Sequence, residues 1–311
     1  MMENQSMKRL HVQTAIFMDT LVTIKVITMQ EEGIVNEKID QAYEAFRGVE
    51  AHCSRFDPNS ELRQLSSYIG TPVKVTELLY QAVQFALEMA ALTEGAFDPT
   101  IGATLESSGF NKNYLTGERL KPDTSLEQTP TANYNDVQLD DEERTVTLTK
   151  PLILDLGAVA KGLAIDLAAK VLQVFEGFAI DAGGDVYVSG LNEKGQPWQI
   201  GIRDPINKET VIDIVHLTEG AICTSGSYER VSQIKEETHH LMDPKSKHSA
   251  KGLLSCTAVA PFAMLADAFS TAAFILGEKK GMDLFNENEI QGLMMTSSLQ
   301  KLATEGWGSL S

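Results

Sequence analysis

One carboxylate and two hydroxyls recur at helical spacing in the apolar stretch ADAFSTAAFIL, residues 266–276. Asp267, Ser270 and Thr271 occupy positions i, i+3 and i+4, which lie on one face of a helix. Hard cations such as Mg2+ bind oxygen ligands, usually one or two carboxylates together with waters and substrate phosphates. The pattern indicates a metal site, although a capping aspartate followed by hydroxyls that bond back to the preceding turn has the same spacing.

A second set of polar groups occurs in DLGAVAKG, residues 155–162, directly after the apolar PLIL of 151–154. We expect a strand that ends in a tight glycine turn and leads into a helix whose first N–H groups are free for a phosphate. Asp155 would contact a ligand or hold Lys161, Lys161 would meet a phosphate, and the turn would expose the carbonyl of Ala158. An ordinary turn with Lys161 in solvent fits the same residues.

Two adjacent histidines, His239 and His240, precede an Asp-Pro turn in THHLMDP. Histidine is well suited to move a proton near neutral pH, so the pair is a candidate for acid–base chemistry, with ordinary surface or core histidines as the alternative. The chain has no zinc-ligand spacing around them. It also lacks a GxGxxG fingerprint, a GxxxxGK[ST] loop and a GxSxG elbow, which excludes P-loop nucleotide hydrolysis and the usual serine hydrolase.

The hydrophobic pattern predicts the elements that must position these residues. Alternation predicts strands at 20–27, 151–154, 177–190 with a break at the glycine pair, 198–204, 211–217, 220–226 and 255–261, with hairpins at 136–149 and around 292–298. Apolar residues at helical spacing predict helices within 31–56 and over about 77–92, 159–175 and 264–276, and a short one near Met282. Because helices and strands mix without regular βαβ alternation, we predict an α+β fold with mixed or antiparallel sheets and packed helices.

Composition and charge narrow the class of protein. The 311 residues carry 26 Lys and Arg against 43 Asp and Glu, a formal charge of -17, so nucleic acid and anionic membrane surfaces are poor partners. An acidic protein that binds a phosphate needs N–H groups, a lysine or a cation at the site. Three scattered cysteines suggest no disulfide framework. We read no signal peptide, lipid anchor or membrane span, and we expect a cytoplasmic protein.

Taken together and in this order, several stretches resemble the ApbE family of FAD:protein FMN transferases. They span nearly the whole chain, and their joint order is far more specific than any one of them. The stretches are FMDT (17–20), SRFDPNSEL (54–62), GAFDPTIG (95–102), DLGAVAKG (155–162), DAGGDVYVSG (181–190), CTSGSYER (223–230), HHLMDP (239–244) and ADAFSTAAFILG (266–277).

The resemblance implies a fold and a reaction. The fold would be the T-fold-like α+β architecture of that family, as a single domain over residues 1–311 that leaves room for two lobes. A divalent metal, normally Mg2+, would hold the pyrophosphate of FAD while FMN is transferred to a Ser or Thr hydroxyl of an acceptor flavoprotein with loss of AMP. Such a transfer depends on charge neutralisation and in-line positioning, which suits the residues above.

The resemblance also assigns residues by matching position. The metal ligands would be the Ala158 carbonyl, Asp267, Ser270 and Thr271. The contacts to FAD would be Met18, Phe56, Ala96, Phe97, Asp98, Asp155, Lys161 and Leu241. As catalytic groups we expect Asp155 in the nucleotide site, Lys161 near the pyrophosphate, and His240 as the base for the acceptor hydroxyl with His239 as its substitute.

Some positions depart from the family pattern. Phe56 replaces a common Tyr, ESSGF at 106–110 replaces Leu-Trp-Gly-Phe in one pocket wall, and Ser227 stands where Asp is frequent. Many relatives are exported lipoproteins, whereas we read no export signal in this sequence.

Two alternative functions stay open. One alternative is an Mg2+-dependent FAD pyrophosphatase that gives free FMN and AMP. The other is a non-catalytic FAD-binding protein, which would have no need of the oxygen cluster around Asp267.

Overall fold

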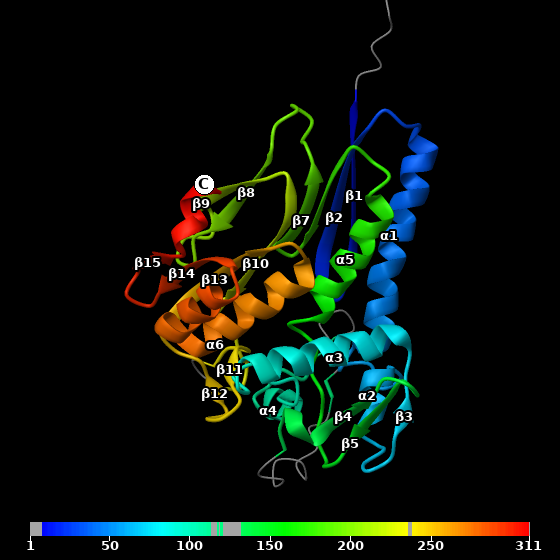
Figure 1. Cartoon of the computed structure of the whole chain (residues 1–311), viewed down its shortest axis with the longest axis vertical. Helices are drawn as coiled ribbons and strands as arrows, with labels where there is room; N and C mark the ends of the chain where they lie inside the picture. Colours follow the sequence, from blue (N-terminus) through cyan, green and yellow to red (C-terminus); the bar gives the residue numbers. More distant parts are fainter. Residues whose placement is uncertain (1–7, 113–116, 118, 121–131, 236–237, 311) are drawn as a thin grey trace, which may run out of the picture.

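A central antiparallel sheet of eight strands organises the chain (Figure 1). The computed structural model describes residues 8–112, 117, 119–120, 132–235 and 238–310. The strand order is β1-β2-β6-β7-β10-β13-β14-β15, and every neighbouring pair is antiparallel. The strands are β1 (Arg9–Phe17), β2 (Thr20–Thr28), β6 (Gly177–Ala182), β7 (Asp185–Gly190), β10 (Glu219–Gly226), β13 (Leu253–Ala260), β14 (Gln291–Thr296) and β15 (Lys301–Ala303).

Three long helices cover one face of this sheet and enclose the main core. They are α1 (Glu32–Cys53), α5 (Ala160–Leu172) and α6 (Ala263–Glu287). Alternate residues of β2, namely Val22, Ile24 and Val26, belong to this core and are fully buried, as the period of two in a strand requires. The burial of this face fixes the register of the sheet, because a shift by one residue would turn these side chains to solvent.

A hairpin and a short helix cover part of the opposite face. The hairpin is formed by β8 (Trp198–Arg203) and β9 (Val211–Leu217), and η3 (Glu305–Ser309) lies beside it. Trp198, Ile202 and Trp307 pack there with Ile27 and Val188 of the sheet in a second, smaller core. The chain therefore has apolar layers on both faces of its main sheet.

A smaller unit lies below the main sheet in Figure 1. It consists of α2 (Glu61–Leu65), β3 (Val73–Lys74), α3 (Glu77–Leu92), α4 (Gly102–Ser107), η2 (Tyr134–Asp136), β4 (Val137–Asp140) and β5 (Thr145–Leu148), with strand order β3-β5-β4. The short strands β11 (Met242–Asp243) and β12 (His248–Ser249) pair near α6. Across the residues described, no helix combines the length and apolar character needed to cross a bilayer.

The α+β prediction is confirmed, with corrections at the level of elements. The strand predicted at 151–154 is wrong: this segment forms only one bridge, between Ile153 and Ile101. A strand at Arg9–Phe17 was not predicted. Its alternate apolar residues, among them Val12 and Ile16, point away from the main core and are more than half exposed, so the pattern carried no burial signal.

The last helix also differs from prediction. The helices expected at 264–276 and near Met282 form one run, α6, interrupted at Gly277, which has a positive φ of 77°. Asp267 lies inside this run and does not cap it. The N-terminus of α6 is held by Asp166 of α5, whose carboxylate accepts hydrogen bonds from the N–H groups of Ala263 (2.7 Å) and Met264 (2.9 Å).

Candidate active site

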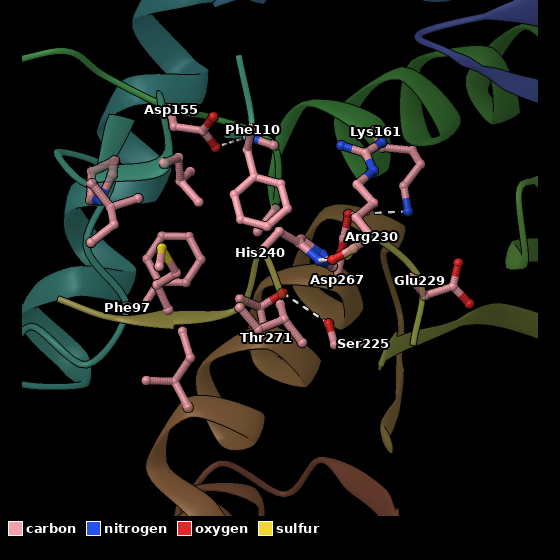
Figure 2. A pocket seen from close by; sticks show the side chains of 18 of the residues that line it. Phe97, Phe110, Asp155, Lys161, Ser225, Glu229, Arg230, His240, Asp267 and Thr271 are labelled. Atoms are coloured by element: carbon pink, nitrogen blue, oxygen red, sulfur yellow. Dashed lines mark hydrogen bonds and ion pairs between the residues drawn. The ribbon is translucent and has the colours of Figure 1, made fainter. Parts of the chain in front are cut away.

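A cleft opens where the main sheet, α5, α6 and the smaller unit meet (Figure 2). Figure 2 shows Phe97 and Phe110 towards one end, Lys161 and Glu229 towards the other, and Asp267 between them. The cleft is lined by Thr20, Arg55, Phe56, Phe97, Asp98, Pro99, Ile101, Leu105, Phe110, Asp155, Gly157, Ala158, Lys161, Ala182, Thr224, Ser225, Gly226, Glu229, Arg230, His240, Leu241, Met242, Pro244, Asp267, Thr271 and Ile275. It therefore has an aromatic end and a charged end.

The face of α6 that was predicted to bind a metal reaches the middle of this cleft. Asp267 and Thr271 line it, and the Thr271 hydroxyl lies 2.9 Å from the hydroxyl of Ser225 on β10. Ser270 is fully buried behind them, where its hydroxyl donates to the carbonyl of Asp267 (2.9 Å) and meets Ser225. Of the two predicted hydroxyls, the structure brings only Thr271 to the cleft.

The Asp267 carboxylate is buried with an uncompensated oxygen. Its Oδ2 accepts no hydrogen bond and lies 3.9 Å from Nζ of Lys161. Burial raises the pKa of Asp267, and the positive charges of Lys161 and Arg230 act in the opposite direction. A buried carboxylate oxygen without a donor is costly, so this atom is suited to receive a cation or a ligand donor.

Lys161, in the first turn of α5, is held by a residue that sequence reasoning did not identify. Its ammonium forms an ion pair with Oδ2 of Asp185, at the start of β7. The other oxygen of Asp185 accepts a hydrogen bond from the N–H of Thr224 at 3.1 Å, which fixes the carboxylate. Lys161 thus lies between two aspartates, Asp185 and Asp267, rather than in solvent or against Asp155.

The turn before α5 holds Asp155 and leaves a carbonyl free. Asp155 accepts hydrogen bonds from Nε of Arg55 (2.6 Å) and from the N–H of Gly157 (2.9 Å). Burial opposes its charge, but the charge and hydrogen bond of Arg55, the N–H of Gly157 and the charge of Arg230 together outweigh burial, so the pKa of Asp155 is lowered. No side chain caps α5, and among the described residues no backbone N–H donates to the carbonyl of Ala158. Gly157, Ala158 and Lys161, at this turn and the start of α5, line the cleft.

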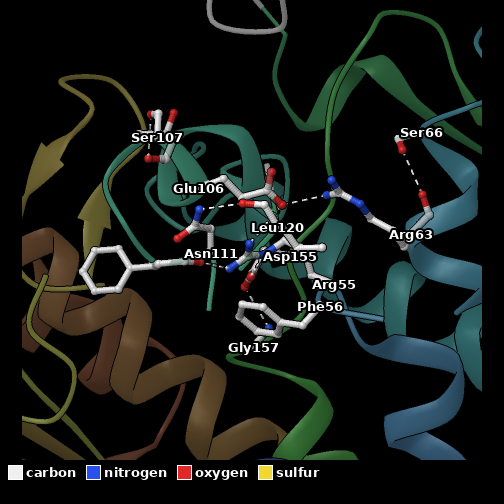
Figure 3. Close-up of polar contacts among 12 residues, drawn as sticks. Arg55, Phe56, Arg63, Ser66, Glu106, Ser107, Asn111, Leu120, Asp155 and Gly157 are labelled. Atoms are coloured by element: carbon white, nitrogen blue, oxygen red, sulfur yellow. Dashed lines mark hydrogen bonds and ion pairs between the residues drawn. The ribbon is translucent and has the colours of Figure 1, made fainter. Parts of the chain in front are cut away.

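A buried arginine, Arg55, supports this turn (Figure 3). Arg55 also donates to Glu106 of α4 (3.1 Å) and to the carbonyl of Phe110 (2.9 Å), and Arg63 of α2 donates to the same Glu106 oxygen (2.7 Å). The guanidinium carbon of Arg55 lies 4.4 Å from the ring centroid of Phe56. Glu106 belongs to the atypical ESSGF segment, so this departure from the family pattern has a structural role here.

The structure separates the two histidines. The ring of His240 lines the cleft, and because its Nδ1 faces the carbonyl of Arg230 (3.4 Å), that nitrogen carries the hydrogen. Burial and the charge of Arg230 lower the pKa of His240 to about 3, so the ring is neutral near pH 7. His239 points away, with Nε2 at 3.0 Å from the carbonyl of Ala250 and its ring against Phe274. His239 therefore does not line the cleft.

The remaining predicted FAD contacts divide into two groups. Phe56, Phe97, Asp98 and Leu241 line the cleft. Asp98 is also engaged locally, since its carboxylate accepts from the N–H and hydroxyl of Thr100 (2.9 and 2.7 Å), and burial raises its pKa. Met18 and Ala96 are not among the lining residues. Met18 instead lies in the two-residue turn between β1 and β2, with a positive φ of 50°.

Several residues in or beside the cleft were missed by sequence reasoning although they lie inside stretches that it quoted. Arg55, Asp185 and Arg230 belong to SRFDPNSEL, DAGGDVYVSG and CTSGSYER respectively. Within the described residues, no group of three or more His, Cys, Asp or Glu forms a metal site.

Comparison with known proteins identifies the family. The family model described as "ApbE family" matches residues 18–294. FAD:protein FMN transferases from Vibrio cholerae and Haemophilus influenzae are 30% and 27% identical, over 90% and 88% of this chain and 86% and 82% of theirs. The crystal structure of the ApbE protein from Thermotoga maritima is 30% identical and superposes with a TM-score of 0.86, covering 97% of this chain and 99% of that one. The chain therefore belongs to the ApbE family.

Proposed function

We propose that this protein transfers FMN from FAD to a Ser or Thr hydroxyl of an acceptor protein and releases AMP. Relatives that match most of the chain carry the name FAD:protein FMN transferase. The observation that carries the proposal is the uncompensated Asp267 oxygen 3.9 Å from Lys161, inside a cleft with an aromatic end. A site for a flavin ring alone would have no use for this pair.

The two ends of the cleft suit the two parts of FAD. Phe97 and Phe110 offer apolar surfaces for a ring system. Lys161, Arg230 and the N-terminal end of α5 offer positive potential for a pyrophosphate. Asp185 holds Lys161 in place, so the ammonium is oriented before the substrate arrives.

We further propose that the site uses Mg2+. Asp267, the Ala158 carbonyl and the Thr271 hydroxyl supply the hard oxygen ligands that this ion prefers, and one carboxylate is a common number when substrate phosphates complete the shell. Ser270 would support this set by fixing the Asp267 carbonyl and Ser225 rather than by contact. When bound, the ion would neutralise charge on the pyrophosphate during transfer.

The neutral His240 ring is positioned to accept the proton of the incoming hydroxyl. Its Nδ1 carries the hydrogen, so Nε2 has a free lone pair. A pKa of about 3 makes a weak base, but the charge of Arg230 is one cause of that value. A pyrophosphate paired with Arg230 would offset this charge and raise the basicity of the ring.

The test is to incubate the protein with FAD and Mg2+, with and without a Ser/Thr-bearing flavoprotein acceptor domain, and to follow AMP and acceptor mass together. The proposal expects AMP to appear with an acceptor heavier by one FMN. AMP and free FMN formed equally without acceptor would instead identify a pyrophosphatase. Bound FAD without any product would identify a flavin-binding protein.

A further inference from the structure

A second groove lies on the sheet face opposite the three long helices. Its floor is formed by side chains of four neighbouring strands, and its wall is β8. The lining residues are Thr23, Lys25, Ala179, Asp181, Gly184, Val186, Val188, Trp198, Gln199, Ile200, Gly201, Ile202, Arg203, Ile222, Thr224, Tyr228 and Glu229. The β8–β9 hairpin covers only part of this face, and the groove is the space that it leaves beside it.

The wall of the groove is the unpaired edge of β8. Within the part of the chain that the structure describes, this strand pairs only with β9, and all its residues from Trp198 to Arg203 line the groove while none of β9 does. Consecutive residues of a strand point to opposite faces, so a groove that touches all of them runs along the backbone edge. Such an edge offers N–H and C=O groups to an extended segment of another chain.

The groove leads into the charged end of the catalytic cleft. Thr224 and Glu229 line both spaces. The N–H of Thr224 binds Asp185, and Asp185 holds Lys161, so the shared border lies next to the groups assigned to the pyrophosphate. A Ser or Thr side chain is short, so the backbone that carries the acceptor hydroxyl must pass close to this border.

We propose that an extended Ser/Thr-bearing segment of the acceptor protein lies in this groove as a strand beside β8. The inference rests on the proposed transferase function and adds the path of the protein substrate. Pairing with β8 would supply sequence-independent backbone hydrogen bonds, while floor residues such as Thr23, Lys25 and Asp181 would contact every second side chain.

The surface next to the groove exposes apolar side chains that could contact the folded part of the acceptor protein. Val12, Ile16 and Leu21 are 51%, 57% and 60% exposed. The register pairs Val12 with Lys25 and Ile16 with Leu21, so these side chains share the face that carries the groove floor. An exposed apolar patch that continues a polar groove is typical of a protein-binding surface.

The first test fills the groove without touching the catalytic cleft. In Thr23→Trp, we expect the acceptor concentration for half-maximal transfer to rise at least 10-fold, while the dissociation constant for FAD is unchanged. The matched control is Thr147→Trp, a partly buried strand threonine of β5 that lines neither space. An acceptor dependence in Thr23→Trp equal to that of the control would overturn the proposal.

A second test detects binding of the acceptor without requiring turnover. It distinguishes the transferase hypothesis from the hypothesis that the acceptor binds in the groove. All three native cysteines are buried, so Gln199→Cys can be labelled alone with a thiol-specific photo-cross-linker, with exposed Gln138→Cys of β4 as its control. Only the Gln199 label should cross-link the acceptor, within the segment that contains its modified Ser or Thr. Such cross-links without FMN transfer would refute the transferase function but support binding of the acceptor in the groove. Cross-links elsewhere on the acceptor, or only to a second copy of this chain, would refute the groove.

Discussion

At the scale of single residues, the site is defined by charges that neutralise one another incompletely. Asp185 is satisfied by Lys161 and Thr224, and Asp155 by Arg55 and Gly157. Asp267 is the exception among these three, because within the described residues its Oδ2 accepts no hydrogen bond and lies 3.9 Å from the Lys161 ammonium. Such an arrangement lowers the stability of the fold, and it supports our proposal that Asp267 receives a ligand.

The variant Asp267→Asn should separate catalysis from folding. We expect Mg2+-dependent AMP release to fall at least about 100-fold, since even residues that only support metal ligands can cost that much. The free energy of unfolding should not decrease, because a neutral amide relieves the buried charge whose pKa is raised. The control is Asp283→Asn, an exposed carboxylate on the same helix. Unchanged turnover in Asp267→Asn would remove this residue from the metal site.

His240 should make stability depend on pH. Its folded pKa of about 3 lies below the ordinary value of 6.5, so the unfolded chain binds the proton more readily between these values. The stabilising contribution of the neutral ring is present above pH 6.5 and is lost as the pH falls towards 3. Asp166, with a pKa raised to about 6, acts in the opposite direction over part of this range.

Comparison with His240→Gln isolates the histidine contribution. Urea unfolding from pH 7 to pH 4 should show a shallower loss of stability in the variant than in the wild-type protein. If the free energy of unfolding changes equally with pH in the wild-type protein and in His240→Gln, the ring is solvated and not held neutral. The corresponding variant of exposed His248 should leave the slope unchanged.

At the scale of elements, the active site depends on how α5 is joined to α6. Asp166 of α5 accepts hydrogen bonds from the first two N–H groups of α6, and no side chain of α6 provides its own cap. This contact sets the position of Asp267 and Thr271, one and two turns further along, relative to Lys161 in α5. The distance between the groups that we propose to bind the metal and the phosphates therefore depends on an interhelical cap.

The variant Asp166→Ala should loosen this junction. We expect a loss of about 1 kcal/mol in the free energy of unfolding, as for other helix caps, together with weaker Mg2+ binding because Asp267 loses its fixed position. Denaturant unfolding and Mg2+ titration would measure the two effects. Lys279→Ala, at an exposed position of α6, is the control. A stability loss without any change in Mg2+ binding would show that the cap does not position the site.

Local patterns were sufficient to predict most elements and part of the site. Helical periodicity located α1, α3 and α5, and the spacing of Asp267 and Thr271 placed both on the face that reaches the cleft. Ser270 shares the spacing but turns to the sheet, where Ser225 binds it. The ion pairs of Arg55 and Lys161 join residues distant in sequence, and no local pattern encodes them. The missed strand β1 has its apolar side on the surface.

At the scale of the whole molecule, Arg55 ties the smaller unit to the main sheet. It follows α1 in the chain and binds both Glu106 of α4 and Asp155 before α5. The cleft lies at this junction, so a bound FAD would contact both units. Because the sequence predicts a single domain and Arg55 joins its two units, we expect both units to unfold together.

The two tryptophans make this expectation measurable. Trp198 and Trp307 both lie in the core beneath the β8–β9 hairpin, so their fluorescence reports the main sheet, whereas far-UV circular dichroism also reports α3 and α4 of the smaller unit. Both signals should give one coincident urea transition. FAD at 100 times its dissociation constant should raise stability by about 2.7 kcal/mol and shift both signals equally.

Arg55→Met should weaken this coupling. Glu106 would keep only Arg63 as a partner and Asp155 would lose its guanidinium, so we expect a loss of about 3 kcal/mol, as when one partner of a buried ion pair is removed. Because the lost contacts join the two units, the circular dichroism transition should move to lower urea than the tryptophan transition. Arg47→Met, which removes an exposed pair with Glu44, should cost less than about 1 kcal/mol and leave the transitions coincident. If both transitions of Arg55→Met shift together, the units are coupled through their apolar core and Arg55 acts only within the cleft.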